Sequence, residues 1–158
     1  MCSSDRYFYS NLCPESNFYK VEGGVTHNGI NLPTSEHHFM YAKAMLMGDH
    51  ESAARIKAAK TPGQAKQLGR RVKPFDHKLW TDSCEEIVTG ILVSKFSTPN
   101  LKAYLLSIEG NIYEASPTDK IWGIGISVKD AENGATHNGR NLLGKCLMKT
   151  RDILRESL

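Results

Sequence analysis

The sequence has no long hydrophobic run and no regular cysteine pattern, and these absences exclude several classes of protein. No apolar stretch approaches the roughly 18 residues that span a bilayer, and the start lacks the basic-then-apolar pattern of a secretory signal. Cys2, Cys13, Cys84 and Cys146 include no C-x-x-C pair, which disfavours zinc fingers and disulfide scaffolds. We expect these thiols to be small structural side chains. We also expect a cytoplasmic, intracellular protein (nuclear in a eukaryote) that has no membrane partner.

Several familiar catalytic and cofactor motifs are also missing. There is no P-loop, no H-E-x-x-H zinc helix and no G-x-S-x-G nucleophile elbow. Gly123-Ile-Gly125 begins like a dinucleotide fingerprint but has Val128 where the third glycine belongs. We therefore expect no metal and no cofactor. The net charge of +3 permits an anionic ligand without indicating a surface coated by nucleic acid.

The remaining composition is that of one globular domain. The 158 residues are 40% hydrophobic and 23% charged, and they contain no linker and no convincing internal repeat. We expect a single domain over residues 1–158, of the α+β class and dominated by helices, with a small N-terminal β hairpin or sheet.

The expected strands lie in the first third of the chain and near residue 113. Aromatic runs at 7–9 and 18–21 predict extended segments, and residues 111–116 predict a short strand. Asn28-Gly29 between 25–27 and 30–32 predicts a hairpin with a type I′ turn, because these residues accept positive φ angles.

The expected helices follow from apolar periodicity and capping residues. They span residues 36–47, 50–60, 61–69, 77–96, 101–108 and 141–158. We expect Ile153 on the buried face of the last helix. Residues 117–140 are rich in glycine and lack periodicity, which predicts a long functional loop.

The first of these helices places an acid and an amine on one face. Glu36 and Lys43 are seven residues apart, which at about 100° per residue is close to two full turns. Phe39 and Met40 lie between them. The two polar groups could line a pocket from opposite ends, or they could belong to an ordinary solvated face. The residues alone leave both interpretations open.

The loop after residue 113 is a second candidate. Asp119, Trp122, Gly123 and Gly125 combine an acid, a ring that could stack on a ligand, and glycines whose N–H groups can approach an anion. The alternative is a turn whose tryptophan fills the core, and Trp80 has the same ambiguity. The basic residues at 70, 71 and 73 could bind phosphate or only complement a helix dipole.

Six stretches in order resemble the NADAR family, named for "NAD and ADP-ribose associated". They are residues 8–11 (FYSN), 33–44 (PTSEHHF…AKA), 65–70 (AKQLGR), 95–96 (KF), 114–125 (EASPTD…WGIG) and 141–151 (NLLG…LM…R). The resemblance implies an N-glycosidase that cleaves a ribose C1–N bond without metal. It implies ADP-ribose on guanine bases of nucleic acid or nucleotides as the substrate. The alternatives are phosphoribosylamino-pyrimidine intermediates of riboflavin synthesis, or a non-catalytic module that binds ADP-ribose.

The resemblance also implies the site. Glu36 would be the acid–base group, Lys43 would stabilise charge or form a Schiff base, and Asp119 would orient the ribose or assist proton transfer. The implied substrate-binding residues are Ser10, Asn11, Phe39, Arg70, Trp80, Trp122, Gly123, Gly125, Asn141, Leu142 and Gly144. The expected partners are an ADP-ribose or phosphoribosyl ligand and ADP-ribosylated nucleic acid, bound by a monomer.

Overall fold

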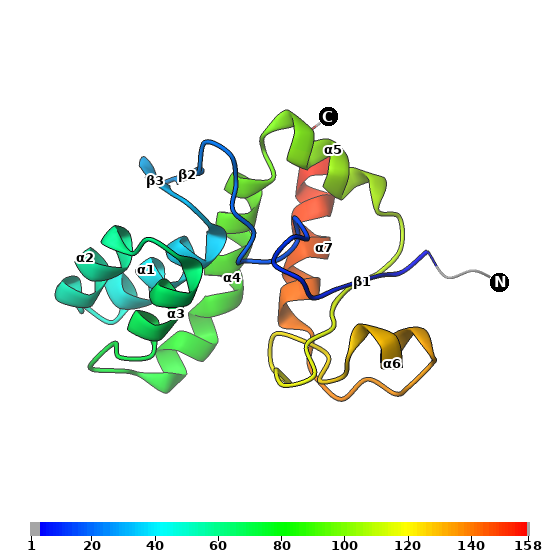
Figure 1. The fold of residues 1–158 in the computed structure, drawn as a ribbon. Helices are drawn as coiled ribbons and strands as arrows, with labels where there is room; N and C mark the ends of the chain where they lie inside the picture. Colours follow the sequence, from blue (N-terminus) through cyan, green and yellow to red (C-terminus); the bar gives the residue numbers. More distant parts are fainter. Residues whose placement is uncertain (1–3, 158) are drawn as a thin grey trace. The chain divides into compact units, whose positions relative to one another are not determined.

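The computed structural model describes residues 4–157, which form seven helices and four short strands in two compact units (Figure 1). The inserted unit is Asn17–Lys95. The split unit contains the chain up to Ser16 and from Phe96 onward. The mixed, helix-dominated fold class expected from the sequence is confirmed.

The inserted unit consists of a hairpin and four helices. Strands β2 (Val25–His27) and β3 (Ile30–Leu32) pair antiparallel, with Val25 opposite Leu32. Asn28 and Gly29 both have positive φ, 51° and 79°, as the type I′ turn requires. The helices are α1 (Ser35–Leu46), α2 (His50–Ala58), α3 (Pro62–Gly69) and α4 (His77–Lys95).

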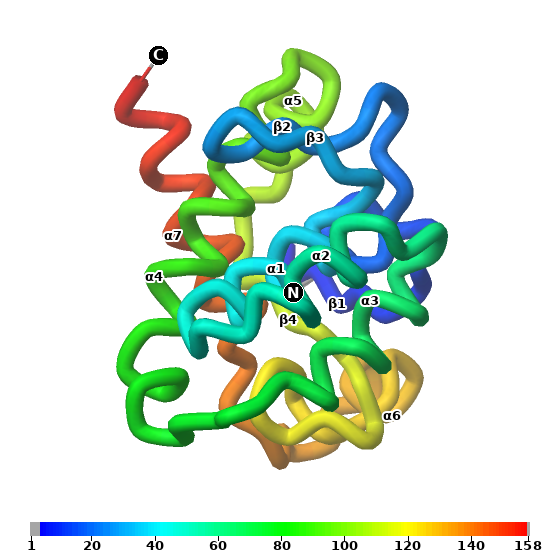
Figure 2. The backbone as a smooth tube through the Cα atoms, turned by 90° about the vertical axis from the view of Figure 1, so that its left-hand side faces the viewer, coloured from blue at the N-terminus to red at the C-terminus, as the bar shows by residue number. Residues whose placement is uncertain are grey.

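Helix α1 is the centre of this unit and packs against α2, α3 and α4 (Figure 2). Its start is held by Thr34, whose Oγ1 accepts a hydrogen bond from the His37 N–H at 3.2 Å. A Cβ on Gly69 would overlap the Met40 side chain, so glycine there allows α3 to approach α1 closely. The buried core around these helices includes Ala44, Ile56, Ala65, Ile91 and Leu92.

The split unit joins the two ends of the chain. Strand β1 (Arg6–Phe8) pairs in parallel with β4 (Ile112–Glu114), which brings Arg6 opposite Ile112. Helix α7 (Leu142–Glu156) packs against β4 and against α5 (Pro99–Ser107), and α6 (Val128–Glu132) lies against β1. The most buried side chains of this unit are Phe8, Phe96, Leu105, Ile112, Ile124 and Leu147.

Several sequence expectations about local structure are wrong. Residues 18–21 form the end of a turn and irregular backbone instead of a strand. The 117–140 segment is not all loop, because Ser127 begins α6 by accepting a hydrogen bond from the Asp130 N–H. Helix α5 begins at Pro99, two residues before the expected start at residue 101, since proline is well tolerated in a first turn. Ile153 is 37% exposed and does not face the core.

The cysteine side chains that the structure describes are mostly buried, as expected for small structural residues. Cys84 and Cys146 are buried and Cys13 is half-buried, whereas Cys2 lies outside the described residues. No helix between residues 4 and 157 has the length and apolar character needed to cross a membrane.

Candidate active site

Glu36 and Lys43 share one face of α1, as their spacing predicts. Glu36 lies in the first turn and is only 6% exposed, and its N–H donates to the carbonyl of Asn17 at 2.9 Å. Lys43 lies in the last turn and is half-buried. The acid and the amine are close enough that the negative charge of Glu36 raises the pKa of Lys43. The arrangement is therefore a partly desolvated acid–amine pair and not a solvated helix face.

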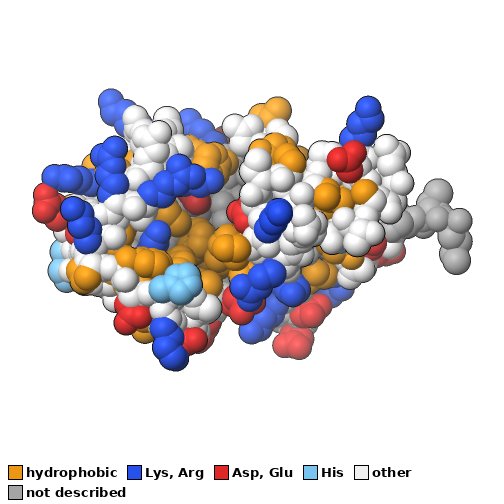
Figure 3. All heavy atoms as spheres, turned by 90° about the horizontal axis from the view of Figure 1, so that it is seen from below, with side chains coloured by type: hydrophobic (Ala, Val, Ile, Leu, Met, Phe, Trp, Pro, Cys, Tyr) orange, Lys and Arg blue, Asp and Glu red, His pale blue; other side chains and the backbone are white. Residues whose placement is uncertain are grey.

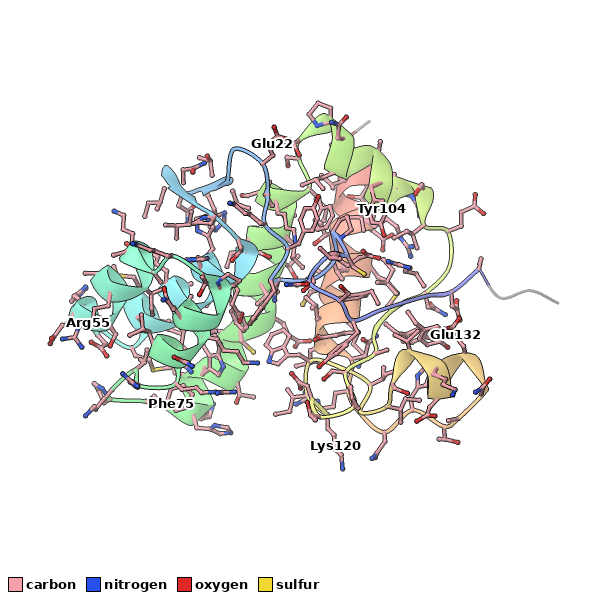
Figure 4. The ribbon with its side chains drawn as sticks, in the orientation of Figure 1. Glu22, Arg55, Phe75, Tyr104, Lys120 and Glu132 are labelled. Atoms are coloured by element: carbon pink, nitrogen blue, oxygen red, sulfur yellow. The ribbon has the colours of Figure 1, made fainter. Side chains whose placement is uncertain are left out.

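Three aromatic rings line this face, and we call them the aromatic wall: Phe39, Phe75 and Trp80. Phe39 and Trp80 stack at 5.3 Å between ring centres with 25° between the planes. The Lys43 amine lies 5.0 Å from the centre of the Phe75 ring and 5.8 Å from that of Trp80. Phe75 projects from the segment before α4 and is 44% exposed (Figure 4). The sequence did not indicate Phe75, because it belongs to no helical repeat.

The surroundings of Lys43 lower its pKa below the usual lysine value. Burial is the main cause, because it disfavours the charged ammonium form. The positive charge of Arg70, which caps the end of α3, lowers this pKa further, and Glu36 opposes both effects. Arg70 therefore acts on the amine through its charge, a role that its place after a helix end did not suggest.

The two histidines next to Glu36 support α1. His37 contacts Thr34 Oγ1 through Nδ1 at 2.8 Å and the Ala59 carbonyl through Nε2 at 2.9 Å. His38 Nε2 contacts the Val25 carbonyl at 2.7 Å, and burial lowers the pKa of both rings. Among residues 4–157, no three His, Cys, Asp or Glu side chains are grouped so that they could hold a metal ion.

In the split unit, Asp119 closes the turn that carries Trp122. Its Oδ1 accepts hydrogen bonds from the N–H groups of Ile121 and Trp122, at 2.9 and 2.8 Å. Its own N–H donates to Ser116 Oγ at 3.1 Å. Trp122 is half-buried, which is between the ligand-stacking and core-filling interpretations. One carboxylate oxygen of Asp119 thus orders the loop.

The two glycines of this loop are required by close backbone contacts. A Cβ on Gly123 would lie 2.9 Å from the carbonyl oxygens of Asp119 and Glu114. Gly125 has φ of +74°, and a Cβ there would overlap the Asn138 carbonyl. Their presence is explained by packing, and contact with an anion stays a prediction.

Asn141 joins this loop to β4 and α7. It adopts the left-handed conformation at φ of 54°. Its Oδ1 accepts from the Glu114 N–H at 3.0 Å, and its Nδ2 donates to the Ile112 carbonyl at 2.9 Å. The N–H groups of Asn141, Leu142 and Leu143 donate to the carbonyls of residues 123, 121 and 122. Three N–H groups at the start of α7 are therefore already hydrogen-bonded to carbonyls of the loop. Because Gly144 has no side chain, this end of α7 packs onto the Ile112 carbonyl.

Ser10 and Asn11 lie exposed in the turn after β1, where Ser10 Oγ accepts from the Leu12 N–H. The sequence did not indicate what holds this turn. Glu15, fully buried, accepts from Arg6 Nε at 2.7 Å and from the Tyr104 hydroxyl at 2.8 Å. Burial and the Glu15 carboxylate together raise the pKa of Tyr104 to about 12. Glu15 thus ties the turn to β1 and α5.

A second aromatic group was also missed. Tyr7 and Tyr113 stack at 5.0 Å across the β1–β4 pair, and His137 lies edge-on to Tyr113 at 4.7 Å. The three residues are 24 or more positions apart in the sequence. The parallel pairing places Tyr7 opposite Tyr113, and the segment after α6 brings His137 to them.

Comparison with known proteins gives consistent matches. The NADAR domain matches residues 3–155. The chain is 42% identical over 124 residues to the N-glycosidase R617 of Acanthamoeba polyphaga mimivirus, covering 75% of this chain and 72% of that protein. It is 32% identical over 159 residues to the N-glycosidase Npun_R5314 of Nostoc punctiforme, covering 96% and 94%.

A riboflavin-related protein and a solved structure also match. The riboflavin biosynthesis protein VVA0006 of Vibrio vulnificus is 29% identical over 143 residues, which cover 89% of this chain but 35% of that protein. The solution structure of the E. coli protein YbiA superimposes with a TM-score of 0.79 at 28% identity, covering 99% of this chain and 88% of that one. The match of the domain over almost the whole sequence, together with these relatives, shows that the chain belongs to the NADAR family of N-glycosidases.

Proposed function

We propose that this protein hydrolyses the bond between ribose C1 and the exocyclic amine of guanine, releasing ADP-ribose from an ADP-ribosylated base. The observation that carries the proposal is the pairing of Glu36 and Lys43 on one partly desolvated face of α1. A buried acid and an amine with a lowered pKa are the two groups that such a reaction uses. A module that only bound ADP-ribose would not need both groups.

Glu36 acts as the acid–base group in this proposal. When the C1–N bond breaks, its electron pair goes to the departing nitrogen, which must gain a proton. A protonated Glu36 supplies that proton and then, as a carboxylate, accepts one from the water that adds to C1.

Lys43 has two roles that fit its surroundings. As an ammonium it would stabilise negative charge on the substrate. As a free amine, favoured by its lowered pKa, it would attack C1 of the ring-opened sugar imine. That attack expels the guanine amine and forms a lysine imine, which water hydrolyses to free ADP-ribose and regenerates the amine.

The remaining residues are proposed to bind the substrate. Trp80 and Phe39 offer a stacked aromatic surface for a base, and Arg70 offers a cation for phosphate. In the split unit, Asp119 is proposed to orient ribose hydroxyls through its second oxygen, and Trp122 to stack on a ring.

The direct test incubates the protein with ADP-ribosyl guanosine and separates the products by chromatography. We expect guanosine and ADP-ribose as products. Substrate that is retained by the protein but stays intact would identify a binding module and contradict the proposal.

A second candidate is supported by the matched Vibrio protein, whose name assigns it to riboflavin biosynthesis. The corresponding substrate is a phosphoribosylamino-pyrimidine, which also carries ribose on an exocyclic amine. The two candidates are separated by comparing kcat/KM for both substrates in one preparation. A higher value for the pyrimidine would replace the guanine assignment.

A further inference from the structure

The positive charge of this protein is concentrated in one short segment of the inserted unit. Residues 50–75 contain seven Lys and Arg and a single acid, a net charge of +6. The whole chain carries +3, so the rest of the sequence sums to −3. We call the seven cations the α2–α3 basic surface: Arg55, Lys57, Lys60, Lys66, Arg70, Arg71 and Lys73.

All seven side chains are exposed. In Figure 3 the Lys and Arg side chains gather at the upper left, over the part of the chain that contains α2 and α3, with little acidic surface among them. Within the described residues, only Arg55 of the seven forms an ion pair, with Glu51 at 2.6 Å. Apart from Arg55, the surface therefore presents six cations that form no ion pair with a carboxylate of the described residues.

A polar hollow of about 590 Å³ lies within this surface, and Arg55, Arg71 and Lys73 are among the residues that line it. The two acids at its edge, Asp49 and Glu51, already have hydrogen-bond or ion-pair partners within the protein. Hydrogen bonds from the Ser52 side chain and from the N–H groups of Lys73 and Ser52 lower the pKa of Asp49 to about 2, and Glu51 pairs with Arg55. The hollow is therefore a place where a phosphate group meets cations whose acidic neighbours have other partners.

The chemistry of the surface fits a nucleic-acid backbone better than a membrane. Between residues 50 and 75 of the described chain, Phe75 is the one large hydrophobic side chain that is exposed, and a single ring is not the apolar helix face that inserts into a bilayer. Repeated cations without such an anchor suit a chain of phosphates, whose binding releases counter-ions.

The surface also adjoins the reactive face of α1. Arg70 belongs to it and lies close enough to Lys43 for its charge to lower the pKa of that amine. A strand held along α2 and α3 would therefore run past the aromatic wall. Enzymes that react with a base take it out of the stack, which costs least for a single strand.

We propose that the α2–α3 basic surface binds the phosphate backbone of a single-stranded nucleic acid and presents the modified guanine of that strand to the α1 face. The presentation step rests on the proposed function, whereas backbone binding does not. Polymer substrates, unlike free nucleotides, would then depend on cations that take no part in the chemistry.

The test uses the full chain and a fluorescent, unmodified single-stranded DNA 20-mer. The variant replaces Lys57, Lys60, Arg71 and Lys73 by Gln and leaves Arg70 in place. A matched control replaces four exposed cations elsewhere, Lys20, Lys129, Lys149 and Arg155, by Gln. Circular dichroism checks that each variant is folded.

For about four phosphate contacts, the binding constant of the wild-type protein should fall roughly 50-fold between 50 and 200 mM salt. The variant should bind at least about tenfold more weakly at 50 mM salt, with a shallower salt dependence, whereas the control should keep most of the affinity. On free ADP-ribosyl guanosine the variant should retain kcat/KM within about twofold, and on the modified 20-mer it should lose about tenfold.

Three results would overturn the proposal: no binding by the wild-type protein, equal losses in variant and control, or tighter binding to phosphatidylserine vesicles than to the strand. Binding of the 20-mer requires no turnover. A protein that binds the strand but cleaves neither substrate would therefore contradict the proposed function and retain the surface. If the variant cleaved each substrate with the same kcat/KM as the wild-type protein, the proposed function would stand and the role of the surface would be contradicted.

Discussion

Glu36 combines burial with a position in the first turn of α1, and this makes it the sharpest test of the chemistry. Glu36→Gln keeps the size and hydrogen-bonding shape of the side chain but removes its proton chemistry. We expect substrate affinity to stay within about threefold and turnover to fall about 100-fold or more. Turnover and binding are measured separately, by single-turnover kinetics and titration calorimetry.

The matched control for this substitution is Glu22→Gln, on an exposed acid of the inserted unit (Figure 4). It should leave both quantities unchanged. Near wild-type turnover in Glu36→Gln would remove Glu36 from the mechanism.

The lowered pKa of Lys43 leads to a prediction for the pH dependence of turnover. Because its pKa is lowered by burial and by Arg70, the reactive free amine forms at lower pH than for an ordinary lysine. Turnover should therefore rise with pH through this lowered pKa. Arg70→Gln removes a positive neighbour, raises the pKa of Lys43 and moves the rise to higher pH, whereas Arg71→Gln should not. The pH profile of kcat for the three proteins measures this.

Trapping with borohydride during turnover decides between the two roles of Lys43. A Schiff base would be reduced to a stable adduct, and mass spectrometry would find ADP-ribose on the peptide that contains Lys43. No adduct, together with an active Lys43→Arg variant, would show that the amine acts through its charge alone.

At the scale of elements, Asn141 joins β4, the glycine loop and α7. Asn141→Ala removes two hydrogen bonds to buried backbone groups and puts alanine into a left-handed conformation. We expect a loss of about 2–3 kcal/mol in the free energy of unfolding. Urea denaturation followed by circular dichroism measures it.

Asn138→Ala is the control, because Asn138 is exposed and lies three residues away. It should change stability by less than about 0.5 kcal/mol. If Asn141→Ala also changed the free energy of unfolding by less than this, the Asn141 side chain would not stabilise the loop. Its role would then be in binding the substrate.

At the scale of the whole molecule, the two tryptophans report on the two units separately. Trp80 belongs to the inserted unit and Trp122 to the split unit. The β1–β4 pair forms only when residues 6–8 meet residues 112–114, which are separated in the sequence by the whole inserted unit. A folded insertion lowers the entropy cost of closing that long loop, so we expect the split unit to depend on it. We therefore expect the single domain predicted from the sequence to unfold cooperatively.

Fluorescence of Trp80→Phe and Trp122→Phe during urea denaturation tests this, one reporter at a time. The two midpoints should coincide once each variant is corrected for its own stability by circular dichroism. Separated midpoints within one variant, between fluorescence and circular dichroism, would indicate two independently unfolding domains.

Much of the local structure could be predicted from the sequence because it depends on neighbouring residues. Asn28-Gly29 specifies its turn through allowed φ angles, and Thr61-Pro62 begins α3 through a cap and a fixed φ. The shared face of Glu36 and Lys43 follows from helix geometry alone. The prediction of a strand at residues 18–21 was wrong because it depended on distant residues: an aromatic run becomes a strand only if another strand pairs with it.

The environment of these residues was decided by the tertiary structure. Burial and the charge of Arg70 lower the pKa of Lys43, and the amine lies beside the rings of Phe75 and Trp80. These three residues come from segments that share no local pattern with α1. The same holds for Glu15, whose partners Arg6 and Tyr104 are 9 and 89 residues away. A sequence determines turns, caps and helix faces because sterics and hydrogen bonding act over a few residues. Burial and charge depend on which distant segments pack together, and only the folded chain settles that.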